Sequence, residues 1–511
     1  MGAGIAQVAA LAGHAVRLYD ARTDAARAAI ERIQANLGQL AQTGKIPGDR
    51  ANCACAKLSI IDSLEGFSGC SLIVEAIVED LEAKRALFRD VEKHISAQAI
   101  LATNTSSISI TAIAAALQQP QRLAGMHFFN PAPIMPLVEI VSGAATSPDI
   151  TDALYATARL WGKMPVRTRS TPGFIVNRVA RPFYAEALRV LQEHAADCAT
   201  IDAVMRESAG FRMGPFELMD LIGNDVNHAV TRSVFDGFCG DPRFTPSPLQ
   251  LELIRAGHLG RKTGRGFYVY DTGEPDPKPS TAVPSSLPSH IEVFGESPFA
   301  MTLAERLQAS ATGFERVTTH GDERIAACDQ CVLYRTDGRT ATARAATNHV
   351  CNTVVIDLAL DDRTATRAAI AAADQADQAG LASASGLLQA AGYAVSFIDD
   401  IPGMIVMRTV AMLANEAADA VNQGVASVAD LDLAMRKGVN YPRGPLEWAD
   451  ALGIDNIVQV LDNLAAAYGE DRYRVSPLLR RKALAGLRFT ERDAEQESTG
   501  QNTAAYEAVR G

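Results

Sequence analysis

Residues 1–20, MGAGIAQVAALAGHAVRLYD, indicate the fold class of the first part of the chain. They predict an apolar helix that starts at Gly2, followed by a strand, HAVRLYD, that ends at Asp20. A helix that leads into a strand in this way is the second half of a βαβ unit. Buried-strand and helical patterns then alternate, with strands expected at 14–20, 57–63, 70–77, 99–105, 122–129 and 136–143. This alternation predicts a doubly wound, Rossmann-like α/β sheet.

Gly2 and Asp20 have nearly the spacing of a nucleotide-binding fingerprint. In this fold a strand and a G-x-G-x-x-G turn precede the helix, and an acid about 20 residues later binds the ribose hydroxyls. Asp20 follows Gly2 by 18 residues, and its charge would repel the 2′-phosphate of NADP, so NAD is favoured. Only the last glycine of the fingerprint is present, as Gly2. We therefore expect an N-terminally truncated domain that lacks its first strand: either Met1 is an internal start, the interpretation we favour, or nucleotide binding is weakened.

Composition limits the class of protein. The 511 residues exceed one ordinary core, so several domains are expected. A net charge of −11 argues against a general nucleic-acid binder. No apolar run approaches the length of a membrane span, and no secretory signal is recognisable, so a cytoplasmic protein is expected. The 8 cysteines are scattered without paired zinc-finger spacing, so no metal site is predicted.

An internal repeat organises the rest of the chain. PGFIVNR (172–178) returns as PGMIVMR (402–408), and GPFELMD (214–220) as GPLEWAD (444–450), both at an offset of 230 positions. We infer that a helical domain is duplicated, with a reduced α/β segment between the copies. The expected domains are an NAD-binding domain at 1–170, a helical substrate and dimerisation domain at 171–270, a linker at 271–294, a degenerate α/β domain at 295–400, a second helical domain at 401–485 (the repeat of 172–260) and a C-terminal tail at 486–511.

Two motifs lie at predicted strand ends. NTSSISI (104–110) follows the strand at 99–105, at the edge where such sheets bind ligands, so Ser106 is a candidate ligand contact; the alternative is a helix N-cap. In GMHFFNPAPIMPLVEI (125–140), His127 ends one strand and Glu139 lies in the next. A hairpin-like return would pair the imidazole with the carboxylate, as a general base requires. The alternative is a packed core histidine beside an edge charge.

Two further motifs follow the first domain. Asn177 lies one turn inside the first helix of the helical domain, and its counterpart in the repeat is Met407. A polar amide that the repeat does not keep is more typical of function than of structure. Lys262 lies in GRKTGRGFYVYD (260–271) within a local cluster of positive charge, which suits a phosphate; a solvated turn is the alternative.

The assembled set resembles the L-3-hydroxyacyl-CoA dehydrogenase family. NTSS, HFFNP, LVE, PGFIVNR, GPFELMD and KTGRGFY occur in the family's order and spacing. The long form, with a second dehydrogenase-like half, is similar to bacterial enzymes that oxidise 3-hydroxybutyryl-CoA or 3-hydroxyadipyl-CoA, in fatty-acid β-oxidation or phenylacetate catabolism. The resemblance implies that His127 is the base, that Glu139 orients it, and that Ser106 and Asn177 bind the substrate oxygen. It also implies NAD contacts from Gly2, Asp20, Glu79, Lys84, Ser106, Asn130 and Lys262, and a CoA phosphate contact from Lys45.

The sequence therefore predicts an NAD-dependent oxidoreductase acting on an acyl-CoA substrate, with no nucleic-acid or membrane partner. We expect a monomer or homodimer in which the second helical domain is an internal pseudo-partner and is structural. One alternative is a non-catalytic acyl-CoA-binding or structural relative that lost nucleotide binding. Another keeps the chemistry on a β-hydroxy acid without CoA.

Overall fold

The computed structural model describes residues 1–270, 277–318 and 323–490. Its described residues divide into two compact units. Unit 1 contains residues 1–178 and 423–439, and unit 2 contains residues 179–422 and the chain from residue 440 onward. Among the described residues, no helix combines the length and the apolar character that crossing a membrane requires.

Unit 1 is built on a five-stranded sheet in the order β3-β4-β5-β6-β7, in which β5 and β6 are antiparallel and the other neighbours are parallel. The strands β1 and β2 pair in parallel as a separate two-stranded sheet. The strand bounds are β1 Val16–Leu18, β2 Leu58–Ile60, β3 Leu72–Glu75, β4 Ile100–Thr103, β5 Leu123–Phe128, β6 Leu137–Ser142 and β7 Met164–Arg169. The six predicted strands are thus confirmed, each shorter at its ends than the apolar run that predicted it.

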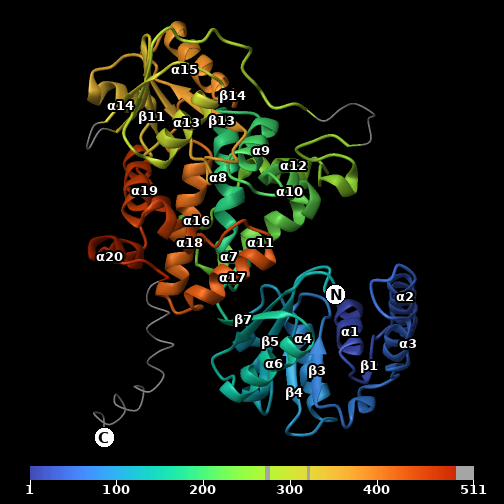
Figure 1. Ribbon diagram of the computed structural model, residues 1–511. Helices are drawn as coiled ribbons and strands as arrows, with labels where there is room; N and C mark the ends of the chain where they lie inside the picture. Colours follow the sequence, from blue (N-terminus) through green and yellow to red (C-terminus); the bar gives the residue numbers. More distant parts are fainter. Residues whose placement is uncertain (271–276, 319–322, 491–511) are drawn as a thin grey trace, which may run out of the picture. The chain divides into compact units, whose positions relative to one another are not determined.

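The helices of unit 1 pack on this sheet through small apolar residues. In α1, Ile5 packs on strand residues such as Ala102 and Met126, while Ala6 and Ala10 face α2 and α3. Figure 1 shows α1 beside α2 and α3. The helix bounds are α1 Gly2–Leu11, α2 Thr23–Gln42, α3 Gly48–Ala56, α4 Leu81–Glu92, α5 Ile110–Ala114, α6 Pro148–Leu160, α7 Val176–Val179 and α17 Val428–Gly438, with short 3-10 turns at Leu64–Phe67 and Pro120–Arg122.

Unit 2 combines a helical part with a seven-stranded sheet in the order β14-β13-β12-β11-β10-β8-β9. Its helices are α8 Arg181–Gln192, α9 Cys198–Glu207, α10 Pro215–Ile222, α11 Asn224–Gly237, α12 Pro248–Arg255, α13 Pro298–Ala309, α14 Ala341–Asn348, α15 Gln378–Ala390, α16 Val406–Asn422, α18 Pro445–Leu452, α19 Ile454–Tyr468 and α20 Pro477–Ala485. Its strands are β8 Ile291–Phe294, β9 Glu315–Val317, β10 Arg324–Cys328, β11 Cys331–Arg335, β12 Thr353–Ile356, β13 Arg367–Ala372 and β14 Ala394–Phe397.

The two GP motifs of the repeat begin helices in the same way. Each helix has proline at its first turn, and a glutamate side chain returns to the backbone N–H of the capping glycine. Glu217 accepts from Gly214 at 3.1 Å in α10, and Glu447 accepts from Gly444 at 3.0 Å in α18. The shared letters therefore correspond to shared local structure.

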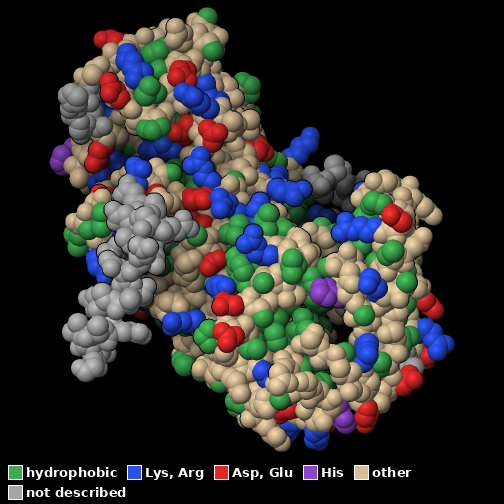
Figure 2. Space-filling view, turned by 60° about the horizontal axis from the view of Figure 1, so that its bottom comes forward, with side chains coloured by type: hydrophobic (Ala, Val, Ile, Leu, Met, Phe, Trp, Pro, Cys, Tyr) green, Lys and Arg blue, Asp and Glu red, His purple; other side chains and the backbone are tan. Residues whose placement is uncertain are grey.

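The structure differs from the predicted boundaries at the linker, and it places residues 171–178 and 423–439 in unit 1. Residues 291–294 of the predicted linker form β8, because their apolar side chains are taken up by the core of the second sheet, while residues 271–276 lie outside the described residues. Of the predicted tail, residues 491–511 also lie outside them. On the face shown in Figure 2, positive and negative side chains are intermixed among the described residues, so on this face the net negative charge is spread rather than gathered.

Candidate active site

The antiparallel pair β5–β6 joins the predicted imidazole and carboxylate. His127 and Glu139 are direct partners in the strand register, and His127 Nδ1 lies 2.6 Å from Glu139 Oε2. Both side chains are buried. This contact confirms the predicted juxtaposition and excludes the alternative of an unrelated edge charge. Because the carboxylate occupies Nδ1, the ring nitrogen available to another group is Nε2.

Glu139 is held from its other side by the start of α7. Its Oε1 accepts hydrogen bonds from the backbone N–H groups of Ile175 at 3.0 Å and Val176 at 3.1 Å. A buried carboxylate is costly unless its oxygens are partnered, and here both are used. The position of the carboxylate, and through it the imidazole ring, is therefore fixed by the backbone of α7.

The aromatic residues around His127 restrict its ring. The ring centroids of Phe129 and Phe174 lie 4.6 Å and 5.9 Å from that of His127. Phe174 has a φ of 49°, the left-handed region that a bulky residue rarely adopts. This strained turn carries the chain from β7 into α7, and so directs the Ile175 and Val176 amides at Glu139.

The turn after β4 wraps around the carboxylate of Glu79. Its Oε1 accepts from the Thr105 hydroxyl at 2.6 Å and from the backbone N–H groups of Ser106 and Ser107 at 2.9 and 3.1 Å. Burial raises the pKa of Glu79, but the Thr105 hydrogen bond, the Lys84 ammonium and the two serines outweigh it, so the pKa lies below its ordinary value. Glu79 thus stays ionised and shapes the turn that presents Ser106.

The N-cap alternative for this motif is confirmed at Ser109 and not at Ser106: the Ser109 side chain caps α5 by accepting from the N–H of Ala112. Asn104 accepts from the N–H of Phe128 at 2.8 Å and ties the end of β4 to the end of β5. Since β4 and β5 are parallel neighbours, the turn with Ser106 and the strand end with His127 share one edge of the sheet.

Asn177 faces the same turn. Its Nδ2 donates to the carbonyl oxygen of Ser106 at 3.4 Å, so α7 and the turn after β4 are linked directly. Asn177 therefore lies at the carboxyl edge of the sheet. The edge gathers an imidazole, a carboxylate, a serine hydroxyl and an amide within unit 1.

Lys84 lies between two carboxylates. It is buried, and its Nζ lies 2.7 Å from Glu75 Oε1 and 3.2 Å from Glu79 Oε2. Its ammonium balances the charge of Glu79, and its contact with NAD stays a prediction. The pairing partner Glu75 lies in an apolar strand, which was the missed sequence signal.

The remaining predicted cofactor residues are less constrained. Gly2 begins α1, and a Cβ on it would lie 3.7 Å from Ala76 Cβ, so the helix N-terminus is next to the carboxyl end of β3. Asp20 follows β1, its side chain is 44% exposed, and it accepts from the N–H of Arg22. In unit 2, Lys262 forms an ion pair with Asp225 at 2.5 Å, so its charge is already partnered. Lys45 is exposed in the turn between α2 and α3.

A cavity of about 390 Å³ lies between α1, α2 and the loop of residues 130–134. Its polar lining includes Arg32, Asn36 and Asn130. The loop approaches α1 closely at Gly4, where a Cβ would lie 3.0 Å from Pro133 Cδ. The volume is in the range of small-molecule sites.

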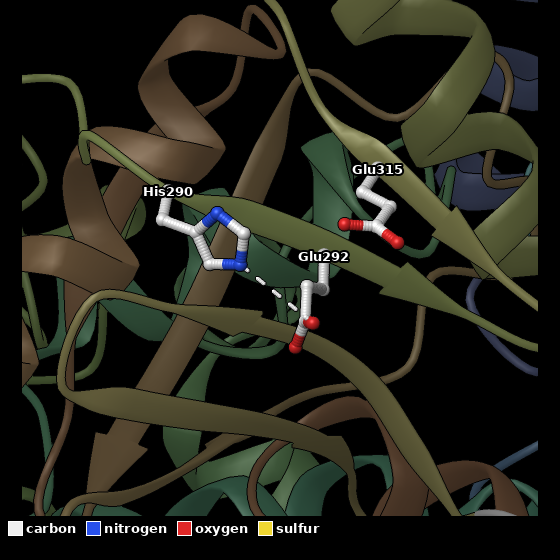
Figure 3. Close-up of side chains that lie close together, drawn as sticks. All are labelled: His290, Glu292 and Glu315. Atoms are coloured by element: carbon white, nitrogen blue, oxygen red, sulfur yellow. Dashed lines mark ion pairs between the residues drawn. The ribbon is translucent and has the colours of Figure 1, made fainter.

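A second cluster of titratable groups lies on the sheet of unit 2. His290, Glu292 and Glu315 come from the start of β8 and from β9, and their ligand-capable atoms lie within 4.8 Å of one another (Figure 3). The parallel register pairs Glu292 with Glu315, so two like charges are neighbours, and His290 Nε2 lies 3.6 Å from Glu292 Oε1. Because His290 is 62% exposed, we assign the cluster to this ion pair and to no ligand.

Comparisons with known proteins agree with this site. The family model for the 3-hydroxyacyl-CoA dehydrogenase NAD-binding domain matches residues 1–171, and that for the C-terminal domain matches both 173–270 and 403–494. A model of the 3-hydroxybutyryl-CoA dehydrogenase reduced Rossmann-fold domain matches 333–402. The chain belongs to the 3-hydroxyacyl-CoA dehydrogenase family. It is an oxidoreductase that uses NAD, and these findings favour the enzyme over the non-catalytic alternative.

The similar proteins differ in how much of the chain they share. Escherichia coli 3-hydroxyadipyl-CoA dehydrogenase is 44% identical over 484 residues, 95% of each chain. A probable 3-hydroxybutyryl-CoA dehydrogenase of Bacillus subtilis is 40% identical over 53% of this chain and 94% of its own. A crystal structure of E. coli 3-hydroxybutyryl-CoA dehydrogenase superposes with a TM-score of 0.86 at 43% identity, covering 95% of this chain and 96% of that one.

The NAD-binding model matches from residue 1, so the comparisons give no support to the predicted truncation.

Proposed function

We propose that the chain oxidises an L-3-hydroxyacyl-CoA to the 3-ketoacyl-CoA, with His127 as the base. The observation that carries this proposal is the 2.6 Å contact between His127 Nδ1 and Glu139 Oε2 at the carboxyl edge of the sheet. With Nδ1 bound to the carboxylate, Nε2 accepts the proton of the 3-hydroxyl, and Glu139 stabilises the imidazolium that forms. Ser106 and Asn177 donate hydrogen bonds to the substrate oxygen as it becomes a carbonyl.

The residues of unit 1 fit NAD. The first N–H groups of α1, at Gly2, have no partner within the helix and suit a pyrophosphate, and Asp20 suits the ribose hydroxyls. Asn130 and Ser106 lie in the loops that follow β5 and β4, and Glu79 shapes the second of them. Bound NAD would supply the hydride acceptor. Lys262 stays a weaker candidate because Asp225 already partners it.

We propose the cavity between α1 and α2 as the site of the CoA arm. Its amide side chains suit the pantetheine amides, and Arg32 together with the nearby turn of Lys45 suits the phosphates. Arg32→Ala and Lys45→Ala should each raise the KM for acyl-CoA severalfold and leave the KM for NAD unchanged. Arg27→Ala, an exposed arginine of α2 that does not line the cavity, is the matched control. Equal effects of Arg27 and Arg32 variants would contradict this assignment.

We propose 3-hydroxyadipyl-CoA as the substrate and 3-hydroxybutyryl-CoA as the second candidate. The adipyl assignment is supported by the similar E. coli enzyme of that name, which shares both halves of the chain. The butyryl assignment is supported by an E. coli structure of the same extent that carries that name. Measuring kcat/KM for a series of 3-hydroxyacyl-CoA lengths, with and without a terminal carboxylate, decides between them. Competition by free CoA separates both from a β-hydroxy acid without CoA.

We further propose that residues 401–485 repeat residues 172–260 and act as an internal pseudo-partner in a monomer or homodimer. The constant offset of 230, the two matches of one C-terminal family model and the two equivalent glycine–glutamate caps support this duplication. The proposal predicts that deleting residue 401 onward from the chain yields a species that aggregates or pairs with a second copy. A stable, fully active monomer after that deletion would contradict it.

A further inference from the structure

Unit 1 is completed by a helix from far along the chain. Residues 423–439, which contain α17, belong to unit 1, although the chain before residue 423 and after residue 439 belongs to unit 2. The helix packs against β6 and β7. Because β6 carries Glu139, the structure that holds the proposed base includes a part of the second helical segment.

Two hydrogen bonds attach the beginning of this segment to unit 1. The backbone N–H of Arg169, the last residue of β7, donates to the carbonyl of Val425 at 2.9 Å. The buried guanidinium of Arg178 donates from Nη1 to Gln423 Oε1 at 2.9 Å. Arg178 follows Asn177 directly, so the anchor is next to the proposed substrate amide.

The last residue of α17, Gly438, packs closely against two residues that adjoin Glu139: Leu137 on the same strand and Val176 at the start of α7. A Cβ on Gly438 would lie 2.6 Å from Leu137 Cδ2 and 3.1 Å from Val176 Cγ2. Leu137 is two residues before Glu139 on β6 and so lies on the same face of the sheet. Val176 donates its N–H to Glu139 Oε1. Gly438 has no left-handed backbone conformation, so a larger residue here would be opposed by the side chains of Leu137 and Val176, which are both buried and have little room to move.

The counterpart of this contact in the other copy carries a side chain. Ser208, offset by 230 from Gly438, donates from Oγ to the carbonyl of Arg367 at 2.8 Å, and Arg367 is offset by 230 from Leu137. There the strand position equivalent to Glu139 is Ala369, and the equivalent N–H groups are accepted by Asp357, at the position equivalent to His127. The first helical segment thus covers the second hairpin, the second segment covers the first hairpin, and the glycine lies at the hairpin that carries the His127–Glu139 pair.

We propose that Gly438 is a positioning residue for the dehydrogenase reaction: α17 of the second helical segment holds Leu137 and Val176 so that Glu139 stays aligned with His127. This inference rests on the proposed roles of His127 and Glu139. The second half of the chain is therefore part of the proton-transfer machinery as well as a structural support. The proposal changes the earlier expectation that the second half is structural alone.

The test uses graded side chains at position 438 in the full chain. Gly438→Ala should lower kcat about threefold and Gly438→Val at least tenfold, while the KM values for NAD and acyl-CoA stay within twofold of wild type. Ala429→Val, on the exposed part of the same helix, is the control and should leave kcat unchanged. Adding Leu137→Ala to Gly438→Val should restore kcat at least threefold relative to Gly438→Val, because it provides the missing space.

Unchanged kcat in both folded variants at position 438 would overturn the proposal, and so would a loss of kcat that tracks loss of folded protein and is not restored by Leu137→Ala. If Gly438→Val does not fold, the Gly438→Ala variant alone decides by the same threefold criterion. A His127→Gln variant that keeps wild-type activity would instead overturn the proposed function, so the two failures are distinguishable.

Discussion

Two antiparallel strand pairs, β5–β6 and β12–β13, occupy equivalent positions at an offset of 230 residues but carry different side chains. In unit 1, β5 and β6 oppose His127 to Glu139. In unit 2, the equivalent positions at an offset of 230 are Asp357, which directly follows β12, and Ala369 of β13, and the N–H of Asp357 donates to the carbonyl of Ala369 at 3.0 Å. One hairpin presents an imidazole supported by a carboxylate, and the other presents a carboxylate alone.

Both carboxylates accept hydrogen bonds from equivalent backbone N–H groups. Glu139 accepts from the N–H groups of Ile175 and Val176, and Asp357 accepts from those of Ile405 and Val406, again at an offset of 230. The strained turn that precedes these amides also recurs, with φ of 49° at Phe174 and 53° at Met404. The strain and the capped amides are therefore properties of the shared scaffold. What distinguishes the first hairpin is that its carboxylate comes from β6 and leaves the β5 position free for histidine.

The largest expected change in stability concerns Met407, the counterpart of Asn177. Met407 is 6% exposed, so Met407→Ala should cost about 3 kcal/mol of unfolding free energy. Its kcat should stay within twofold of wild type. Asn177→Ala should do the opposite, lowering kcat about tenfold with little loss of stability. Denaturant unfolding and steady-state rates of the two variants check this, and a reversed pattern would remove the distinction between the copies.

The next prediction concerns the effect of Glu139→Gln on kcat. The glutamine oxygen would take the Ile175 and Val176 N–H groups and leave its NH₂ facing His127 Nδ1, which forces the proton onto Nε2. With the accepting nitrogen blocked, kcat should fall about 100-fold. Glu82→Gln, an exposed residue of α4, is the control in the same assay. Retention of more than half the wild-type kcat would show that the carboxylate is only structural.

Asp357→Asn should separate structure from catalysis in the second hairpin. Asp357 accepts four backbone N–H groups, from Leu358, Ile405, Val406 and Met407, and asparagine has one oxygen for them. We expect a loss of about 2 kcal/mol in unfolding free energy and an unchanged kcat. Urea unfolding and turnover measured on the same preparation check this. A drop in kcat comparable with that of Glu139→Gln would break the comparison.

The smallest effect is a change in the pH dependence of stability. Burial raises the pKa of Asp357 although four N–H groups favour its charge. Above the ordinary carboxyl pKa near 4, the folded state keeps a proton that the unfolded state has released, so this group lowers stability as pH rises through the window. Asp357→Asn removes this contribution, and its stability deficit should shrink from pH 4.5 to pH 7.5. A deficit that grows over this range would contradict the assignment.

The strands of the first domain and the pairing of His127 with Glu139 could be predicted from the sequence, because they depend on local patterns. The two strands around NPAPIMP are short and apolar, so the turn between them fixes which residues face each other, and the pairing of His127 with Glu139 follows. The positions of the strands and helices of the first domain followed from their alternation in the same way.

The surroundings of Lys84 and the placement of α17 depend on packing between residues that are far apart in the sequence. The ion pairs of Lys84 with Glu75 and Glu79 were not predictable, because no local pattern in the sequence shows that these carboxylates enclose it. The place of α17 in unit 1 was not predictable, because the repeat shows that Gly438 corresponds to Ser208 but not which hairpin each one covers.

The central claim is that proton transfer depends on one imidazole in the first hairpin. Single-turnover NADH formation by His127→Gln at saturating NAD and acyl-CoA tests it most directly, with His94→Gln as the matched control. We predict that His127→Gln slows this step about 1000-fold with unchanged NADH affinity, and that His94→Gln matches wild type. A His127→Gln rate within threefold of wild type would contradict the account.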